Sequence, residues 1–169
     1  MKADTKAVTN EARFAYTQGL QRPDEHGFYT LCVLIPKTDK KTEADLRAKA
    51  KLAADSNAAV FGGKVPPNLK MPLRDGDLEK DDPDFKGHWF FNCKTKQRPG
   101  IVDADRQPIL DLSEVYSGCY GRVSVVFYAY SREGNKGVGC GLQNVQKTRD
   151  GAPMGGRSTA EADFADFLA

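Results

Sequence analysis

Apolar residues in this chain recur mainly with a period of two, the spacing of strands whose side chains alternate between two faces. Residues 12–17 (ARFAYT) alternate in this way, and residues 28–35 (FYTLCVLI) form a nearly continuous apolar run that closes at Pro36. Such a run is typical of a strand buried on both faces. Residues 1–10 are polar and without periodicity, which predicts an irregular lead-in.

One early stretch has helical spacing instead. Residues 42–45 (TEAD) approximate a capping box, and alanine and leucine then recur every three or four residues. We expect this helix to end near Gly62 and Gly63. Residues 64–87 are rich in Pro, Asp and Gly, which predicts a long loop, and long loops inside compact domains are often functional.

The second half of the chain predicts four more strands. Pro99 with Gly100 turns the chain between the first two, and Gly134 with Asn135 joins the last two as a hairpin. The expected strands are residues 88–96, 100–103, 120–132 and 137–148. About six strands and one helix predict a mainly β fold, an OB-like antiparallel β-barrel with one inserted α-helix. We place this domain at residues 1–148, followed by a flexible linker and acidic tail at residues 149–169.

Length and composition favour a single globular domain. The chain has 169 residues, of which 40% are hydrophobic and 28% charged, enough for one core and too few for two. No apolar run approaches the roughly 18 residues that cross a bilayer, and the first residues lack the apolar stretch of a signal peptide. We therefore expect a cytoplasmic protein that does not contact membranes.

The four cysteines are scattered singly, at Cys32, Cys93, Cys119 and Cys140. No Cys-x-x-Cys pair occurs, and the two histidines are not spaced to complete a zinc site. We expect four reduced cysteines in or near the core, with no metal site and no cofactor.

The strand at residues 120–132 has two chemically different faces. Its odd positions carry Val123, Val125 and Phe127, which predicts a core face. Its even positions place three tyrosines between cations, at Tyr120, Arg122, Tyr128, Tyr130 and Arg132. Aromatic rings that stack on unpaired bases, beside cations that follow the phosphates, are what a single-stranded nucleic acid groove requires. Tyrosines on an exposed face can also simply support β structure.

A second strand gives the same pattern. In residues 88–96 the even positions share one side of the sheet and continue to Arg98, which brings together Phe90, Lys94, Lys96 and Arg98. In the first strand Arg13 and Tyr16 fall on opposite faces, so we expect at most one of them on this surface. The predicted nucleic-acid site is therefore Phe90, Lys94, Lys96, Arg98, Tyr120, Arg122, Tyr128, Tyr130 and Arg132.

The charge is divided unevenly along the chain, although the net charge is only +2. The last twelve residues hold three acidic side chains and no Lys or Arg, so the preceding 157 residues carry 25 basic against 20 acidic side chains. This end interleaves carboxylates with aromatic rings, and its predicted partner-binding residues are Asp163, Phe164, Asp166 and Phe167. Such a tail can dock on a partner protein or compete with DNA for the protein's own groove, and the alternative is a helical turn packed on the barrel.

Two other classes of function stay open. Residues 75–84 hold six carboxylates that could bind Mg²⁺ in a nuclease, although metal catalysis needs its carboxylates on rigid elements. A barrel that binds only proteins is the other class. Residues 137–141 (GVGCG) resemble a nucleotide fingerprint, but no helix follows, which favours a strand where bulky neighbours or a ligand backbone approach closely.

Three segments carry a family resemblance: residues 98–103 (RPGIVD), 114–122 (EVYSGCYGR) and 137–147 (GVGCGLQNVQK). With the acidic end at residues 163–168, they resemble the bacteriophage single-stranded DNA-binding proteins, long described only as a domain of unknown function. The resemblance implies an OB-fold without a cofactor that coats and protects single-stranded DNA, independently of sequence, during phage replication or recombination in the infected host cell. It also implies an acidic tail that modulates binding or recruits replication or recombination proteins, and it leaves the oligomeric state open.

Overall fold

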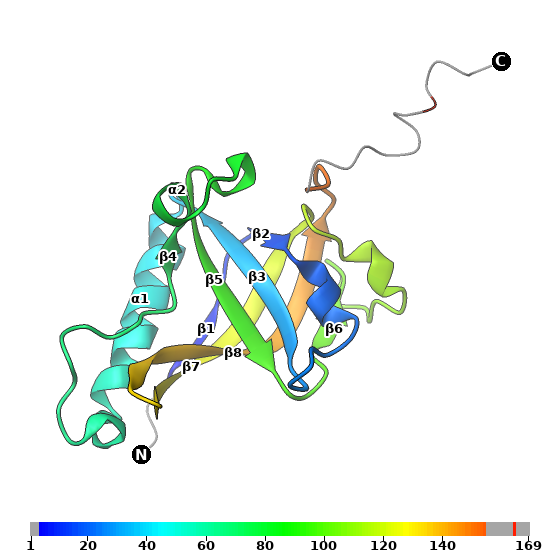
Figure 1. Ribbon diagram of the computed structural model, residues 1–169. Helices are drawn as coiled ribbons and strands as arrows, with labels where there is room; N and C mark the ends of the chain where they lie inside the picture. The colour runs from blue at the N-terminus through cyan, green and yellow to red at the C-terminus, as the bar shows by residue number, and fades with distance from the viewer. Residues whose placement is uncertain (1–3, 155–163, 165–169) are drawn as a thin grey trace.

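The computed structural model describes residues 4–154 and residue 164. Its centre is a closed ring of five strands, in which each strand pairs with the next and the last pairs with the first (Figure 1). In ring order these are β2 (Ala12–Ala15), β3 (Tyr29–Pro36), β5 (His88–Thr95), β8 (Asn135–Arg149) and β7 (Tyr120–Arg132). The β5–β8 pair is parallel and the other four are antiparallel. The expected OB-like barrel with one inserted helix is confirmed.

Three short strands extend this ring. β1 (Lys6–Val8) pairs with β7, β6 (Gly100–Val102) with β8, and β4 (Arg74–Asp75) with β5. The expectation of an irregular lead-in at residues 1–10 is therefore wrong at β1. Three residues are too few to show alternation in the sequence, and only Ala7 of β1 is buried.

The barrel interior is filled from every strand of the ring, and α1 (Lys40–Asp55) closes one side of it. The side chain of Asp39 caps this helix by accepting a hydrogen bond from the Thr42 amide at 3.1 Å. Leu46 and Ala50 of α1 are buried against the strands. The helix ends at Asp55, earlier than expected, and a 3₁₀ turn then leads to Gly62, whose left-handed φ of 89° stops the segment.

Short helical segments occupy the connections, including the expected loop at residues 64–87. α2 (Gly76–Glu79) and the 3₁₀ turn η3 (Pro83–Phe85) lie in that loop, and Phe85 is buried. The other 3₁₀ turns are η1 (Thr17–Leu20), η2 (Ala58–Phe61) and η4 (Leu112–Glu114). The long loop is thus folded, and it covers the first residues of β5.

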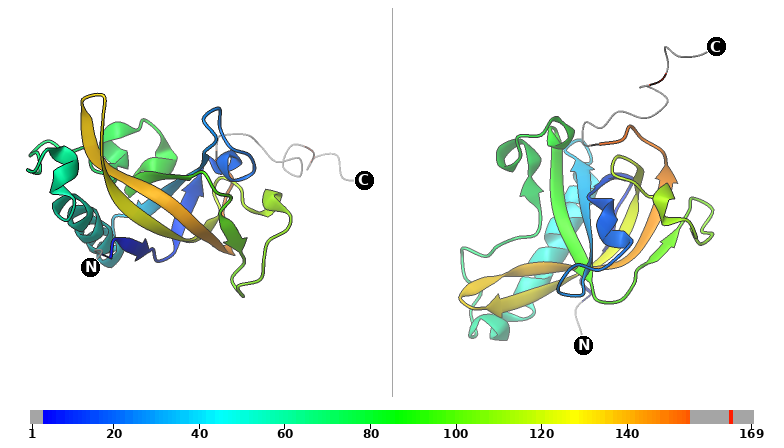
Figure 2. Two further views of the ribbon diagram at one scale, coloured as in Figure 1. Left: turned by 90° about the horizontal axis from the view of Figure 1, so that it is seen from below. Right: turned by 45° about the vertical axis from the view of Figure 1, so that its right-hand side comes forward.

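The β7–β8 hairpin turns at Glu133 and Gly134, whose φ values of 52° and 83° are both left-handed. This is the geometry of a two-residue turn that matches the twist of the strands it joins. The hairpin extends beyond the ring, as both views of Figure 2 show. At its other end β8 continues to Arg149, one residue past the expected domain boundary, and residues 150–154 pack back onto the barrel.

All four cysteines are free thiols with buried side chains, which confirms the prediction of reduced core cysteines. Within the described part of the chain, no helix is long and apolar enough to cross a membrane.

Candidate nucleic-acid interface

An open groove of about 1060 Å³ runs over the outer face of β3 and β5. The β7–β8 hairpin borders one end of it, and the connection between β2 and β3 borders the other. Its lining side chains include Tyr16, Phe28, Asn92, Lys94, Tyr128, Tyr130 and Arg132. The groove therefore gathers four of the predicted site residues with three that the sequence reasoning did not include.

The alternation of faces along β7 follows the prediction. Val123, Val125 and Phe127 are buried in the core, whereas Tyr128 is 39% exposed on the outside. In β5 the same alternation buries Phe91 and leaves Lys94 exposed.

Tyr128 and Tyr130 each lie directly opposite a glycine of β8, Gly139 and Gly137 respectively. A Cβ atom at Gly139 would lie 2.4 Å from Cζ of Tyr128, and one at Gly137 would lie 2.9 Å from Oη of Tyr130. The rings therefore lie against the bare backbone of β8, as expected for the close approach predicted at residues 137–141. Burial raises the pKa of Tyr128 above its ordinary value.

The loop residue Lys70 fixes the hairpin from the side. Its amide donates to the Lys136 carbonyl at 3.1 Å, and its carbonyl accepts from the Val138 amide at 2.9 Å. Its Nζ donates to Oδ1 of Asn135 at 3.0 Å. The tyrosine pair is thus held on a braced hairpin, an arrangement that no local signal around Lys70 in the sequence indicates.

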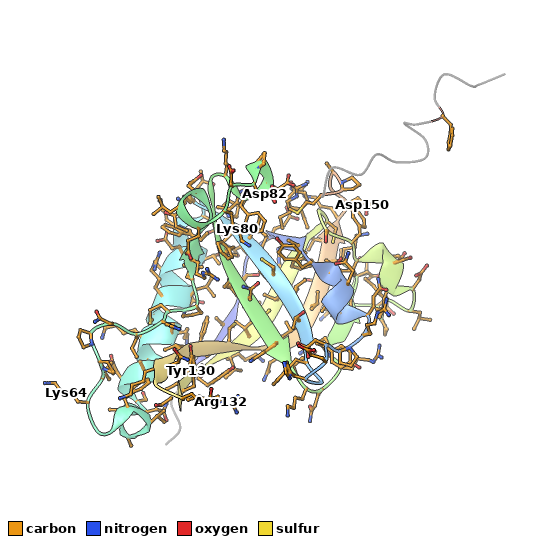
Figure 3. All side chains as sticks on the ribbon, in the orientation of Figure 1. Lys64, Lys80, Asp82, Tyr130, Arg132 and Asp150 are labelled. Carbon is orange, nitrogen blue, oxygen red and sulfur yellow. The ribbon has the colours of Figure 1, made fainter. Side chains whose placement is uncertain are left out.

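Several cations in or beside the groove contact rings instead of carboxylates. Lys94 lines the groove, whereas Lys80, Lys96 and Arg98 lie beyond its lining residues. Nζ of Lys94 and Nζ of Lys96 lie 4.5 and 5.2 Å from the ring centroid of Phe28, and Arg98 stacks over Tyr29 at 5.3 Å. At the end of the β3–β5 face far from the hairpin, Nζ of Lys80 lies 5.3 to 5.7 Å from the ring centroids of Tyr16, Phe85 and Phe90. Figure 3 shows Lys80 at the opposite end of the β3–β5 face from Tyr130 and Arg132.

The cations in and beside the groove keep their charge available. Among the described residues, no carboxylate oxygen lies within 4.0 Å of the side-chain nitrogens of Lys80, Lys94, Lys96, Arg98 or Arg132. A ring holds such a cation in place without neutralising it, so the charge can still meet a phosphate.

Tyr120 and Arg122 point outward from the same strand but lie outside the groove. Tyr120 is eight residues from Tyr128, which is roughly 26 Å along a strand. The guanidinium of Arg149 covers the Tyr120 ring at 3.8 Å and forms an ion pair with Glu11 at 2.8 Å. Tyr120 and Arg149 are therefore already paired within the protein, whereas Arg122 has no carboxylate within 4.0 Å among the described residues.

The prediction that Phe90 offers an exposed ring is wrong, because its side chain is only 1% exposed. Alternation does point it outward, but residues 76–85 fold over it and Phe85 meets its ring edge-on at 5.3 Å. Phe90 is therefore covered and presents no ring face to the groove.

The expectation that Arg13 and Tyr16 lie on opposite faces is also wrong. β2 ends at Ala15, and Tyr16 has a left-handed φ of 53°, which breaks the alternation. As a result Tyr16 is 53% exposed at the groove, and Arg13 points outward beside Tyr120. The sequence carries no pattern that would have found Tyr16, since a single backbone angle decides its direction.

Of the predicted tail residues, only Phe164 is described, and it is 64% exposed. Asp163, Asp166 and Phe167 lie outside the described residues.

The acidic loop considered for a nuclease uses its carboxylates locally. Nζ of Lys37 contacts Asp75 at 2.6 Å and Asp77 at 2.7 Å, and it holds the pKa of both carboxyls below the usual range. Glu79 pairs with Arg74 at 2.7 Å. Within residues 4–154 and residue 164, no group of three or more His, Cys, Asp or Glu side chains is arranged to hold a metal ion. The geometry therefore does not favour a metal-dependent nuclease.

Comparison with known proteins identifies a family for this chain. The family described as "Enterobacter phage Enc34, ssDNA-binding protein" matches residues 5–168. The protein p50 of Acyrthosiphon pisum secondary endosymbiont phage 1 is 36% identical over 97 residues, which are 57% of this chain. That match spans about half of the relative, 52% of its length.

Solved structures show the same fold at lower identity. The single-stranded DNA-binding protein of bacteriophage Enc34 is 20% identical, with a TM-score of 0.78 over 98% of this chain and 97% of that one. Its complex with ssDNA gives a TM-score of 0.77 at 20% identity, over 92% and 96% of the two chains. For gp2.5, a single-stranded DNA-binding protein encoded by bacteriophage T7, the TM-score is 0.66 at 19% identity, over 99% and 96%. Because the family match covers nearly its whole length, this chain belongs to the family of the Enterobacter phage Enc34 ssDNA-binding protein.

Proposed function

We propose that this protein binds single-stranded DNA along the β3–β5 groove, independently of sequence, and coats exposed strands during phage DNA replication or recombination in the cytoplasm of the infected cell. The observation that carries the proposal is the pairing, in one open groove, of tyrosine rings with cations that have no carboxylate partner among the described residues. Bases stack on such rings while the cations neutralise the phosphates.

The position of the groove supports this function. In OB-folds the second and third strands and the adjoining loops bind oligonucleotides. Here β3 and β5 occupy those places in the ring, the β2–β3 connection supplies Tyr16 and Phe28, and the β7–β8 hairpin supplies Tyr128 and Tyr130. The Enc34 protein, which has the same fold, was solved in complex with ssDNA.

Binding should depend little on base identity. The groove offers mainly ring faces and flexible cations, and stacking tolerates every base because each has a π-face. The amide of Asn92 is one exposed group in the groove that could read a base edge, and a single amide gives only modest preference.

The decisive experiment compares a labelled single strand, a duplex and an RNA of equal length, each incubated with the protein and Mg²⁺ and analysed by gel shift. We expect the single strand to be retarded intact and the duplex to bind far more weakly. Cleavage of the single strand would favour the nuclease alternative, and an unshifted single strand would reject the proposal in favour of a protein-binding barrel.

The acidic tail is proposed to compete with DNA for the groove. Deleting residues 159–169 removes three carboxylates that oppose phosphate binding, so we expect severalfold tighter binding at low salt, measured by fluorescence anisotropy. The matched control keeps the tail length and replaces Glu161, Asp163 and Asp166 by their amides, which should give most of the same gain. Unchanged or weaker binding after deletion would contradict competition and favour a tail packed on the barrel.

The tail is also proposed to recruit replication or recombination proteins. Phe164 is exposed, and an exposed ring among carboxylates suits a basic pocket with an apolar floor.

A further inference from the structure

Residues 150–154, which follow β8, are fastened to the barrel by several hydrogen bonds, and we call this segment the clasp. Oη of Tyr116 donates to the Gly151 carbonyl at 2.9 Å, and Nη2 of Arg13 donates to the Ala152 carbonyl at 2.6 Å. The Met154 amide donates to the Ser117 carbonyl at 2.9 Å. Oη of Tyr116 also lies within hydrogen-bond distance of Oδ1 of Asp150, at 3.1 Å, so the clasp is bonded at four of its five residues.

Two glycines allow the clasp to approach this closely. A Cβ atom at Gly151 would lie 2.2 Å from the Gly118 carbonyl oxygen and 2.6 Å from Cε2 of Tyr120. A Cβ atom at Gly118, whose φ is 115°, would lie 2.1 Å from the Ala152 carbonyl oxygen. Any side chain at either position would push the two backbones apart, so the contact has a shape that only glycine permits.

Hydrogen bonds lead from the clasp to Tyr16 at the edge of the groove. Ser117 accepts from the Met154 amide through its carbonyl and from the Thr17 amide through its Oγ, at 3.3 Å. Thr17 follows Tyr16 directly, and the left-handed φ of Tyr16 is a conformation that persists only when its surroundings impose it. The clasp supplies part of that surrounding structure.

Packing and charge also connect the clasp to Tyr16 and Lys80. Met154 packs against the apolar cluster that includes Ala15, Phe85 and Phe90. The ring of Phe85 lies 6.3 Å from that of Tyr16, centroid to centroid, and Nζ of Lys80 lies over both. Arg13, which holds the Ala152 carbonyl, also lies 3.7 Å from the carboxylate of Asp84, the neighbour of Phe85.

We propose that the clasp positions Tyr16 and Lys80 for contact with DNA, so that residues 150–154 belong to the DNA-binding domain and do not act as a passive linker. This inference rests on the proposed function for its effect on binding. It assigns to Arg13, Ser117 and Met154 a positioning role, because none of them lines the groove itself.

The test compares Gly151→Val, Tyr16→Ala and the double variant in the full-length protein. We expect each single variant to weaken binding to a single-stranded oligonucleotide by roughly tenfold, the effect of losing one stacked base. The double variant should lose far less affinity than the product of the two single losses, because the Tyr16 contact can be removed only once. Hydrogen exchange should accelerate in residues 16–20 of Gly151→Val even without DNA.

Additive losses in the double variant, or unchanged exchange at residues 16–20, would overturn the positioning role. The fluorescence of Trp89, the only tryptophan, reports whether each variant is folded. Its ring contacts Lys37 and Arg47, neither of which takes part in the clasp. Should Gly151→Val unfold, Arg13→Lys replaces it, since one ammonium cannot reproduce the hydrogen bonds of Arg13 to both Gly118 and Ala152. If the wild-type protein fails to bind DNA, the proposed function falls, and the exchange measurement alone decides on the clasp.

Discussion

Replacing Tyr128 and Tyr130 together by alanine is expected to weaken single-stranded DNA binding by at least about thirtyfold, since each stacked base contributes roughly 1 to 3 kcal/mol. Both rings lie on the braced hairpin and border the groove, so their removal leaves the cations without a stacking platform. Fluorescence titration with a labelled oligonucleotide at fixed salt measures the loss. Replacement of both by phenylalanine should preserve most of the affinity, because stacking needs the ring and not the hydroxyl.

Tyr120→Ala is the matched control for this prediction. Tyr120 is on the same strand and points to the same side, but Arg149 covers its ring and it lies outside the groove. We expect a much smaller change in affinity than for the hairpin tyrosines. An equal loss from Tyr120→Ala, or no loss from the hairpin variants, would show that DNA follows a different surface.

Gly139→Val displaces the ring of Tyr128 without removing it. Its Cβ would fall 2.4 Å from Cζ of Tyr128, so the ring has to leave the backbone of β8. We expect a loss of affinity comparable to that of Tyr128→Ala. Wild-type affinity in this variant would show that the position of the ring against β8 does not matter.

The sequence predicts those features of the fold that depend on neighbouring residues along a strand. The bounds of β7 agree with the prediction at residues 120–132, where Val123, Val125 and Phe127 occupy every second position and form the core face. The outward direction of Tyr128 and Tyr130 follows from the same alternation. The glycines of residues 137–141 indicate a close approach, and the structure shows that the approaching groups are these two tyrosines and, at Gly137, Lys70.

The remaining parts of the site depend on contacts between distant segments. Alternation gives the direction of Phe90 correctly, but it carries no information about residues 76–85, which cover the ring. Likewise Tyr16 reaches the groove through one left-handed residue at the end of β2. The sequence also does not distinguish Arg149, which is paired with Glu11, from Lys94, which has no carboxylate within 4.0 Å among the described residues.

Salt is expected to weaken binding steeply, because each phosphate neutralised on a single strand contributes about −0.7 to the slope of log affinity against log salt concentration. Six cations in or beside the groove lack carboxylate partners in the described part of the chain: Lys70, Lys80, Lys94, Lys96, Arg98 and Arg132. If four or five of them meet phosphates, the slope is about −3 to −3.5, so a tenfold rise in salt lowers affinity by about a thousandfold or more.

Single substitutions then show which cations contribute to the salt dependence of binding. Lys94→Gln should reduce its magnitude by about 0.7, because one phosphate contact is lost. Lys51→Gln is the matched control, since Lys51 lies on α1, pairs with Asp55 at 2.7 Å and does not line the groove. Titrations at four or more salt concentrations measure both slopes. Equal slopes for the two variants would mean that DNA phosphates do not pass Lys94, and a wild-type slope near zero would mean that the groove cations do not neutralise DNA at all.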